Sequence, residues 1–189
     1  MVGTFTLAHI SNHLAALGGI DAHIRTMTAL RLIYRHPVGE AILLGAILLQ
    51  VGSGLTGLRS AWRRQGVPRG QAVSGAVLAF FLLAHTTAIL LGRVAWHLDT
   101  NFFYGAAPLL SGWLPVWFVP YYAAGIIAVG VHLGAVAYWR VPRPRRRVAL
   151  AAPVVLAVVT AVLVLLAFSG SLFPITLPEA YAYSFAWAR

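Results

Sequence analysis

Long apolar runs separated by short polar connections dominate the pattern of this chain. The clearest run covers residues 71–93, QAVSGAVLAFFLLAHTTAILLGR, and sets one ionisable residue, His85, well inside it. A helix rises about 1.5 Å per residue, so about 20 apolar residues cross a hydrocarbon core about 30 Å thick. The run therefore predicts a membrane-spanning helix. Because polar side chains are costly at that depth, His85 is a candidate functional group.

Four more apolar runs give the same pattern. Together the five predicted spans cover about residues 2–17, 38–58, 71–93, 116–139 and 148–168. Residues 21–35 alternate apolar side chains with arginines at helical spacing, which predicts a short interfacial helix after the first span. The tail, residues 169–189, holds two prolines and several aromatic residues and is expected to lie along the interface. The expected fold class is an all-α, integral membrane bundle of five helices.

Composition supports the membrane assignment. Of the 189 residues, 60% are hydrophobic, and the mean hydropathy is +0.81, which is more apolar than a soluble domain of this length can bury. The chain has no cysteine, which excludes disulfides, thiolate metal sites and cysteine nucleophiles. No pair of carboxylates or nucleophile arrangement for catalysis is present, so at most a non-catalytic subunit of an enzyme is expected.

Arginine placement predicts the topology. The net charge of +10 comes from arginines that sit in short connections between apolar runs, a placement typical of membrane topology and not of nucleic-acid binding. Four arginines lie in the second connection and five in the fourth, whereas the third has only Arg93, offset by Asp99. The positive-inside rule then puts the N-terminus on the cytoplasmic side and the C-terminus outside, with the chain crossing the membrane several times. No cleaved signal peptide is expected, because the first run lacks a basic flank.

Two histidines reach matching depth in this topology. The first and third spans both run outward, which brings His13 and His85 to similar depth in the outer half. Two neutral imidazoles facing one another across a bundle can hold a b-type haem, so His13 and His85 are the predicted metal ligands. His9 is one turn from His13 and could replace it or bond a haem propionate. The alternative for His85 is a purely structural role, in which it donates a hydrogen bond to a backbone carbonyl and ties two helices together.

Other candidate residues flank this pair. His132 lies in the inner half and is expected to contact a quinone or to pack, since its depth does not match that of His85. Arg31 and Arg93 lie on the outer side, where they would pair with haem propionates or anchor in the headgroups. Gln71 and Ser74 could bond a quinone or a propionate, or simply cap their helix. The remaining histidines at 23, 36 and 97 are expected to be solvated at interfaces.

Two resemblances bear on these residues. The QAVSG segment, with His85 ten residues after its glycine, the helix carrying His132 and the AYWRVP turn together resemble the five-helix, two-haem cytochrome b subunits of succinate:quinone and fumarate:quinone oxidoreductases. That resemblance implies that His13 and His85 ligate the haem nearer the outer face, and that His132 matches a ligand of the inner haem. The second run offers Ser53 where the family has the partner ligand, so the resemblance implies one haem. It also implies cytoplasmic flavoprotein and iron–sulfur partners.

The segments AHISNHLAAL, RLIYRHPVGEAILLGAILL and AHTTAILLGR are similar to the cytochrome-b-like membrane anchors of some bacterial adenylate cyclases. Two hypotheses follow. One is a haem b-binding subunit of quinone-linked electron transfer. The other is a haem-free anchor or sensor that binds a lipid-like ligand or a partner protein. Both place the chain in a lipid bilayer, and both leave a homo-oligomer open.

Overall fold

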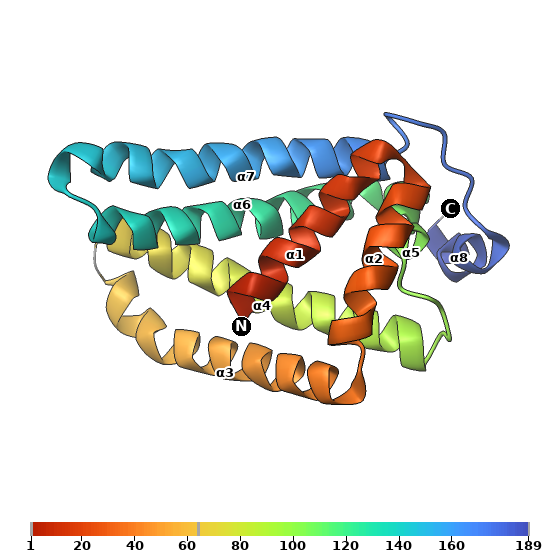
Figure 1. Cartoon of the computed structure of the whole chain (residues 1–189), viewed down its shortest axis with the longest axis horizontal. Helices are drawn as coiled ribbons and strands as arrows, with labels where there is room; N and C mark the ends of the chain where they lie inside the picture. Colours follow the sequence, from red (N-terminus) through yellow and green to blue (C-terminus); the bar gives the residue numbers. More distant parts are fainter. Residues whose placement is uncertain (1, 64, 189) are drawn as a thin grey trace.

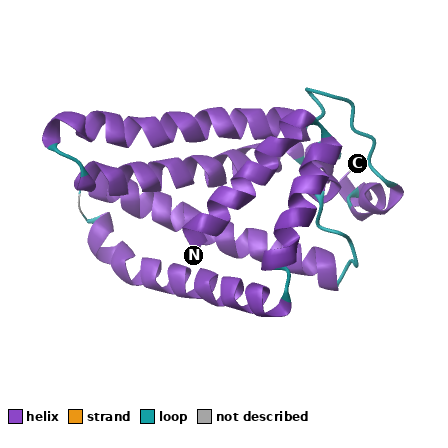
Figure 2. Ribbon diagram, viewed as in Figure 1, coloured by secondary structure: helices purple, strands orange, loops and turns teal. Residues whose placement is uncertain are grey.

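A computed structural model of the protein describes residues 2–63 and 65–188. Every regular element in this part of the chain is helical (Figure 2). The four longest helices are α3 (Pro37–Trp62), α4 (Val67–Val94), α6 (Pro115–Arg140) and α7 (Arg146–Phe168). Figure 1 shows them as two hairpins, α3 with α4 and α6 with α7, that run along the long axis of the bundle.

Four segments of the described chain are long and apolar enough to cross a membrane. These segments are Pro37–Leu58, Val67–Val94, Pro115–Arg140 and Arg143–Phe168, the last beginning in the short helix η3 (Arg143–Arg145). They coincide with the second to fifth predicted runs. The all-helical, multi-pass character expected from the sequence is therefore supported.

The expectation of five spans is not confirmed. Helix α1 (Val2–Ala15) has 14 residues, and at 1.5 Å per residue it reaches only about 21 Å, short of a hydrocarbon core. Figure 1 shows α1 starting half-way along the bundle and running obliquely to one end. There η1 (Ala16–Gly18) and Gly19 turn the chain into α2 (Ile20–Tyr34), which runs back beside α1. Gly19 has a φ of 99°, which favours glycine.

Small residues bring the long helices close together. A Cβ atom added to Gly134 of α6 would lie 2.5 Å from the carbonyl oxygen of Leu150 in α7. Gly134 therefore lets α6 and α7 pack by direct backbone approach, as is usual between membrane helices. Gly92 of α4 makes room for a side chain instead, since a Cβ there would lie 2.7 Å from the Tyr104 ring.

A packed cap closes the end of the bundle where the α1–α2 turn lies. It is built from α5 (Phe102–Ala106) and η2 (Ala107–Leu109), with α8 (Glu179–Ser184) and η4 (Ala186–Ala188). Two buried clusters hold it together, one around Phe102 and Phe168 and the other around Tyr104 and Tyr181. We refer to this end as the capped end. Residues 96–115 lie between two of the predicted spans, and their sequence pattern does not indicate the helices α5 and η2. The tail contributes α8 and η4 to this cap, and its Tyr181 and Phe185 side chains pack in the cluster around Tyr104.

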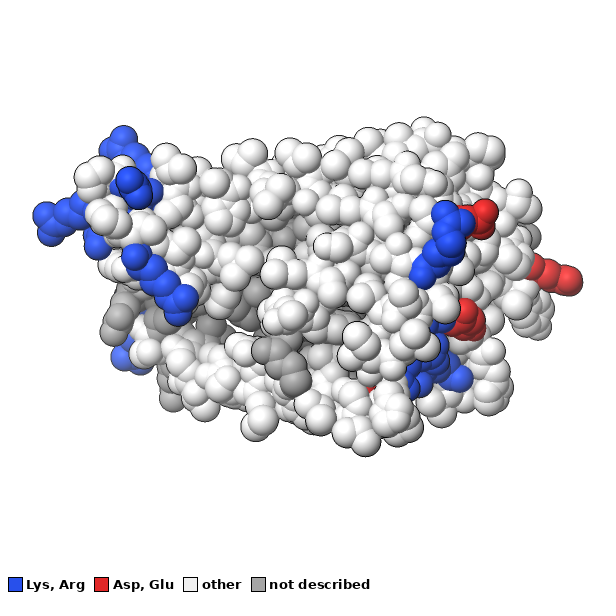
Figure 3. All heavy atoms as spheres, viewed as in Figure 1, with Lys and Arg blue, Asp and Glu red and all other residues white. Residues whose placement is uncertain are grey.

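The opposite end carries most of the positive charge. The connections over residues 59–69 and 140–147 hold four and five of the fourteen arginines, and no acidic residue. Both connections lie at the left of Figures 1 and 3, which we call the arginine-rich end. All four acidic residues belong to segments at the capped end, where they are mixed with arginines. The two ends of the molecule therefore differ sharply in charge.

Candidate functional site

A cavity of about 610 Å³ lies inside the bundle between α1 and the four long helices. This volume is within the range of about 300–1,000 Å³ typical of sites for small molecules and cofactors. Most of the lining is apolar, and its charged, histidine and amide side chains fall into three groups along it. The group nearest the capped end is Arg31, Arg35, Glu40 and Arg93; the middle group is His9, His13 and His85; and Gln50 and His132 lie toward the arginine-rich end.

The middle group brings α1 against α4. The rings of His9 and His85 have centroids 5.8 Å apart, inclined by 64°. His9 also contacts His13, with 3.1 Å between their Nε2 atoms. The ring of Phe81 stacks on His85 at a centroid distance of 5.3 Å and so fixes the face that the imidazole presents. The structure therefore places both predicted ligands, His13 and His85, on one cavity, with His9 packed against both.

A fourth histidine joins this group from α2. His23 is 2% exposed, and its Nε2 atom lies 3.4 Å from His13 Nδ1 and 3.1 Å from Asn12 Nδ2. Burial, and then the positive charge of Arg31, lower the pKa of the His23 imidazole to about 4. The expectation of a solvated His23 was wrong, because α2 turns the face that carries His23 and Met27 toward α1 and the cap. The four-residue spacing of these two side chains is the signal that could have found it.

The cap packs directly on this histidine group. Phe168, at the end of α7, lies edge-on to His13 and to His23, with centroid distances of 5.2 and 5.4 Å. Phe102 of α5 contacts His23 and Phe168 in turn. Two buried polar atoms, Asn12 Oδ1 and His23 Nδ1, have no hydrogen-bond partner among the described residues. The polar network thus retains unused hydrogen-bonding capacity beside the cavity.

Ion pairs line the cavity near the capped end. Arg93 of α4 makes two hydrogen bonds to the Glu40 carboxylate of α3, the second with Nη2 at 3.2 Å from Oε2. Arg31 of α2 pairs with Asp99 at 2.8 Å, and Arg35 lies 3.7 Å from the same carboxylate. Each pair joins elements that are distant in the sequence. Together the pairs hold three guanidinium groups in the cavity lining near the capped end.

His132 lies at the other end of the cavity, against α4. Its Nδ1 atom is 3.4 Å from Ser74 Oγ, while the Ser74 hydroxyl donates to the carbonyl oxygen of Gln71 at 3.0 Å. Gly75 lines the cavity beside the imidazole, and a Cβ added there would make an ordinary contact of 3.7 Å with the His132 ring. Ser74 lines a separate groove. Gln71 is not among the described residues that line the cavity or that groove.

Of the eight predicted site residues, six line the cavity. They are His9, His13, Arg31, His85, Arg93 and His132.

Comparisons with protein-family models, with curated proteins and with solved structures found no match. Within residues 2–63 and 65–188, no three histidine or acidic side chains converge in a way that could hold a metal ion by themselves.

Proposed function

We propose that this chain is a haem b-binding membrane subunit of quinone-linked electron transfer. The observation that carries the proposal is the meeting of imidazoles from α1 and α4 on one cofactor-sized cavity. The haem would lie between His85 and one imidazole of the His9–His13 pair. Haem supplies one-electron chemistry, and bis-imidazole ligation together with burial sets its potential.

The spacing of the imidazole rings suits the binding of a haem iron between two histidines. Two metal–nitrogen bonds of about 2.0 Å each would place the facing ring nitrogens about 4 Å apart, and the ring centroids somewhat further. The 5.8 Å between the His9 and His85 centroids is close to that requirement. His13 is one turn further along α1 and has its Nδ1 atom directed to His23. A ligating histidine usually uses its second ring nitrogen in this way, so His13 would serve as the ligand if its Nε2 atom turned from His9 to the iron.

The arginines near the capped end have a role in the same proposal. Arg31, Arg35 and Arg93 line the cavity next to the histidine group, and guanidinium groups bind carboxylates through paired, charge-assisted hydrogen bonds. Glu40 and Asp99 already offset two of these three charges, so the arginines would hydrogen-bond to the propionates of a haem and balance only part of their negative charge. His132, which lines the opposite end of the cavity beside Gly75, would contact a quinone there.

The charge distribution supports an orientation. The arginine-rich end holds nine arginines and no acidic residue. In a bacterial inner membrane, the positive-inside rule would place that end on the cytoplasmic side. The haem site would then lie in the outer half of the bilayer. Cytoplasmic flavoprotein and iron–sulfur partners would meet the arginine-rich end.

One observation favours a second candidate function, a haem-free anchor or sensor. The side chains of His9, His13, His23 and Asn12 already bond to one another. Such a chain can tie α1 to α2 without any cofactor, and the cavity would then take a lipid-like ligand. This candidate predicts colourless protein, and a His85→Ala variant that folds with little change.

An absorption spectrum separates the two functions. Protein produced with ample haem and reduced with dithionite should show a sharp b-type α band, with one haem per chain. His85→Ala should abolish the band, as should the Ala variant of whichever α1 histidine binds the iron. His132→Ala is the matched control, because it removes an imidazole from the same cavity and should leave the band intact. Purified protein without the band, or a His85→Ala variant that keeps it, would refute the haem proposal.

A further inference from the structure

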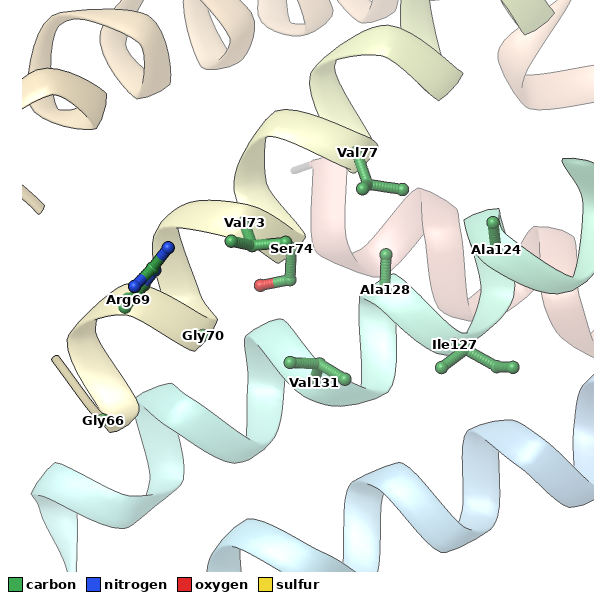
Figure 4. A pocket seen from close by; sticks show the side chains of 10 residues that line it. All are labelled: Gly66, Arg69, Gly70, Val73, Ser74, Val77, Ala124, Ile127, Ala128 and Val131. Atoms are coloured by element: carbon green, nitrogen blue, oxygen red, sulfur yellow. The ribbon is translucent and has the colours of Figure 1, made fainter. Parts of the chain in front are cut away.

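A second, separate depression lies on the outside of the bundle between α4 and α6. This groove, which we call the α4–α6 groove, has a volume of about 470 Å³. Figure 4 shows its two sides, with Val73, Ser74 and Val77 on α4 and with Ala128 and Val131 on α6. The Ser74 hydroxyl donates its hydrogen bond to the backbone carbonyl oxygen of Gln71. The walls of the groove therefore offer an apolar surface to whatever lies in it.

Positive charge marks one end of the α4–α6 groove. Arg69 lines it one turn from Gly66, at the arginine-rich end of the bundle (Figure 4). Arg69 is exposed, its guanidinium carbon lies 6.0 Å from the centroid of the Trp62 ring, and no acidic residue occurs in the flanking connections. An anion approaching the groove at this end meets a strongly positive surface.

The length of the groove matches one leaflet. From Gly66 to Val77 the chain advances eleven residues, which is about 16 Å along a helix. Half of a hydrocarbon core about 30 Å thick is about 15 Å. The groove therefore runs from the level of the headgroups, where Arg69 lies, to about the middle of the membrane.

From this combination we infer that the α4–α6 groove binds an anionic phospholipid. The phosphate of the lipid contacts Arg69, and one acyl chain lies along the small and β-branched residues of α4 and α6. A zwitterionic lipid fits the walls equally well, but its own headgroup cation offsets the phosphate charge, so it gains less from the arginine. This site faces the bilayer and does not depend on the haem.

The inference can be tested by lipid binding to the purified full chain. Native mass spectrometry would measure the retention of phosphatidylglycerol and of phosphatidylcholine with the same acyl chains. The wild-type chain should prefer phosphatidylglycerol. Arg69→Gln should weaken that binding about fivefold, the usual effect of one arginine at an anionic surface, while Arg69→Lys should keep it. Arg63→Gln is the matched control, since it removes a charge from the same connection but outside the groove.

Filling the groove tests the acyl chain separately. Ala124 is exposed on the α6 wall, so Ala124→Phe should block the groove and lower phosphatidylglycerol retention without changing any charge. Val119→Phe, at an exposed position of α6 outside the groove, should have no effect. Equal binding of the two lipids, equal losses for Arg63→Gln and Arg69→Gln, or an unaffected Ala124→Phe variant would overturn the inference. So would a quinone that Ala124→Phe excludes and Arg69→Gln does not affect.

Discussion

The ion pair between Arg93 and Glu40 offers a quantitative test of how α3 is attached to the bundle. We expect Glu40→Gln and Arg93→Gln each to destabilise the folded chain, because each leaves the remaining charge without its partner. Both side chains are 24% exposed, so the pair lies between the fully exposed and the fully buried cases. Exposed pairs contribute about 0.2–1 kcal/mol, and breaking a buried pair costs about 3–5 kcal/mol. Discounting for partial solvent screening, the coupling energy should be about 1–2 kcal/mol.

A double-mutant cycle measures this coupling directly. The free energy of unfolding would be determined in mixed micelles for the wild type, both single variants and the Glu40→Gln, Arg93→Gln double variant. The double variant should lose less than the two single variants together, by the coupling energy. High salt should reduce the coupling only in part, because the pair is partly shielded from solvent. Additive effects of the two substitutions would refute the pairing of α3 with α4 at this point.

Three further predictions address the packing and the cap. Gly134→Ala should lower the free energy of unfolding by about 1–3 kcal/mol, because its Cβ meets the Leu150 carbonyl; Gly45→Ala, where nothing lies within 4 Å, is the control and should be neutral or stabilising. Asn101 caps α5 by accepting from the Phe103 amide, so Asn101→Ala should cost about 1 kcal/mol in the same assay. His23 has its pKa lowered to about 4 in the folded chain from the ordinary 6.5. The unfolded chain therefore binds more protons between pH 6.5 and 4, and stability should fall by up to about 3 kcal/mol over that window and level off below it. Thermal unfolding across this range should show a loss that is smaller by that amount in His23→Gln, since the other buried histidines contribute the remainder, and an unchanged pH profile in that variant would contradict the assignment.

The sequence predicted the long helices well because membrane spans depend on length and hydropathy alone. The runs beginning near residues 38, 71, 116 and 148 all became long helices with bounds close to those expected. The first run also became a helix. Its apolar pattern did not reveal that it covers only part of the membrane thickness, because a short helix leaning on a bundle has the same composition as a slightly short span.

The candidate site was predictable in its parts but not in its arrangement. His85 and the α1 histidines stood out because imidazoles are rare in apolar runs, and the structure does bring them together. The oblique course of α1 decides that His9 packs nearest to His85, and no periodicity in the sequence fixes that tilt. His23 was missed for a related reason, since its burial depends on the cap formed by α5 and the tail. The α4–α6 groove arises from the fit of two helices and has no signature in either one.

The contacts of Phe168 have a consequence for the order in which the molecule can be assembled. This ring, supplied at the end of the last long helix, packs on histidines that were made near the beginning of the chain. Helices delivered to a membrane one after another would leave those histidines without their apolar neighbour until α7 is in place. Completion of the cavity wall therefore follows the insertion of α7, and any chain truncated before the end of that helix would present an unfinished pocket to the lipid.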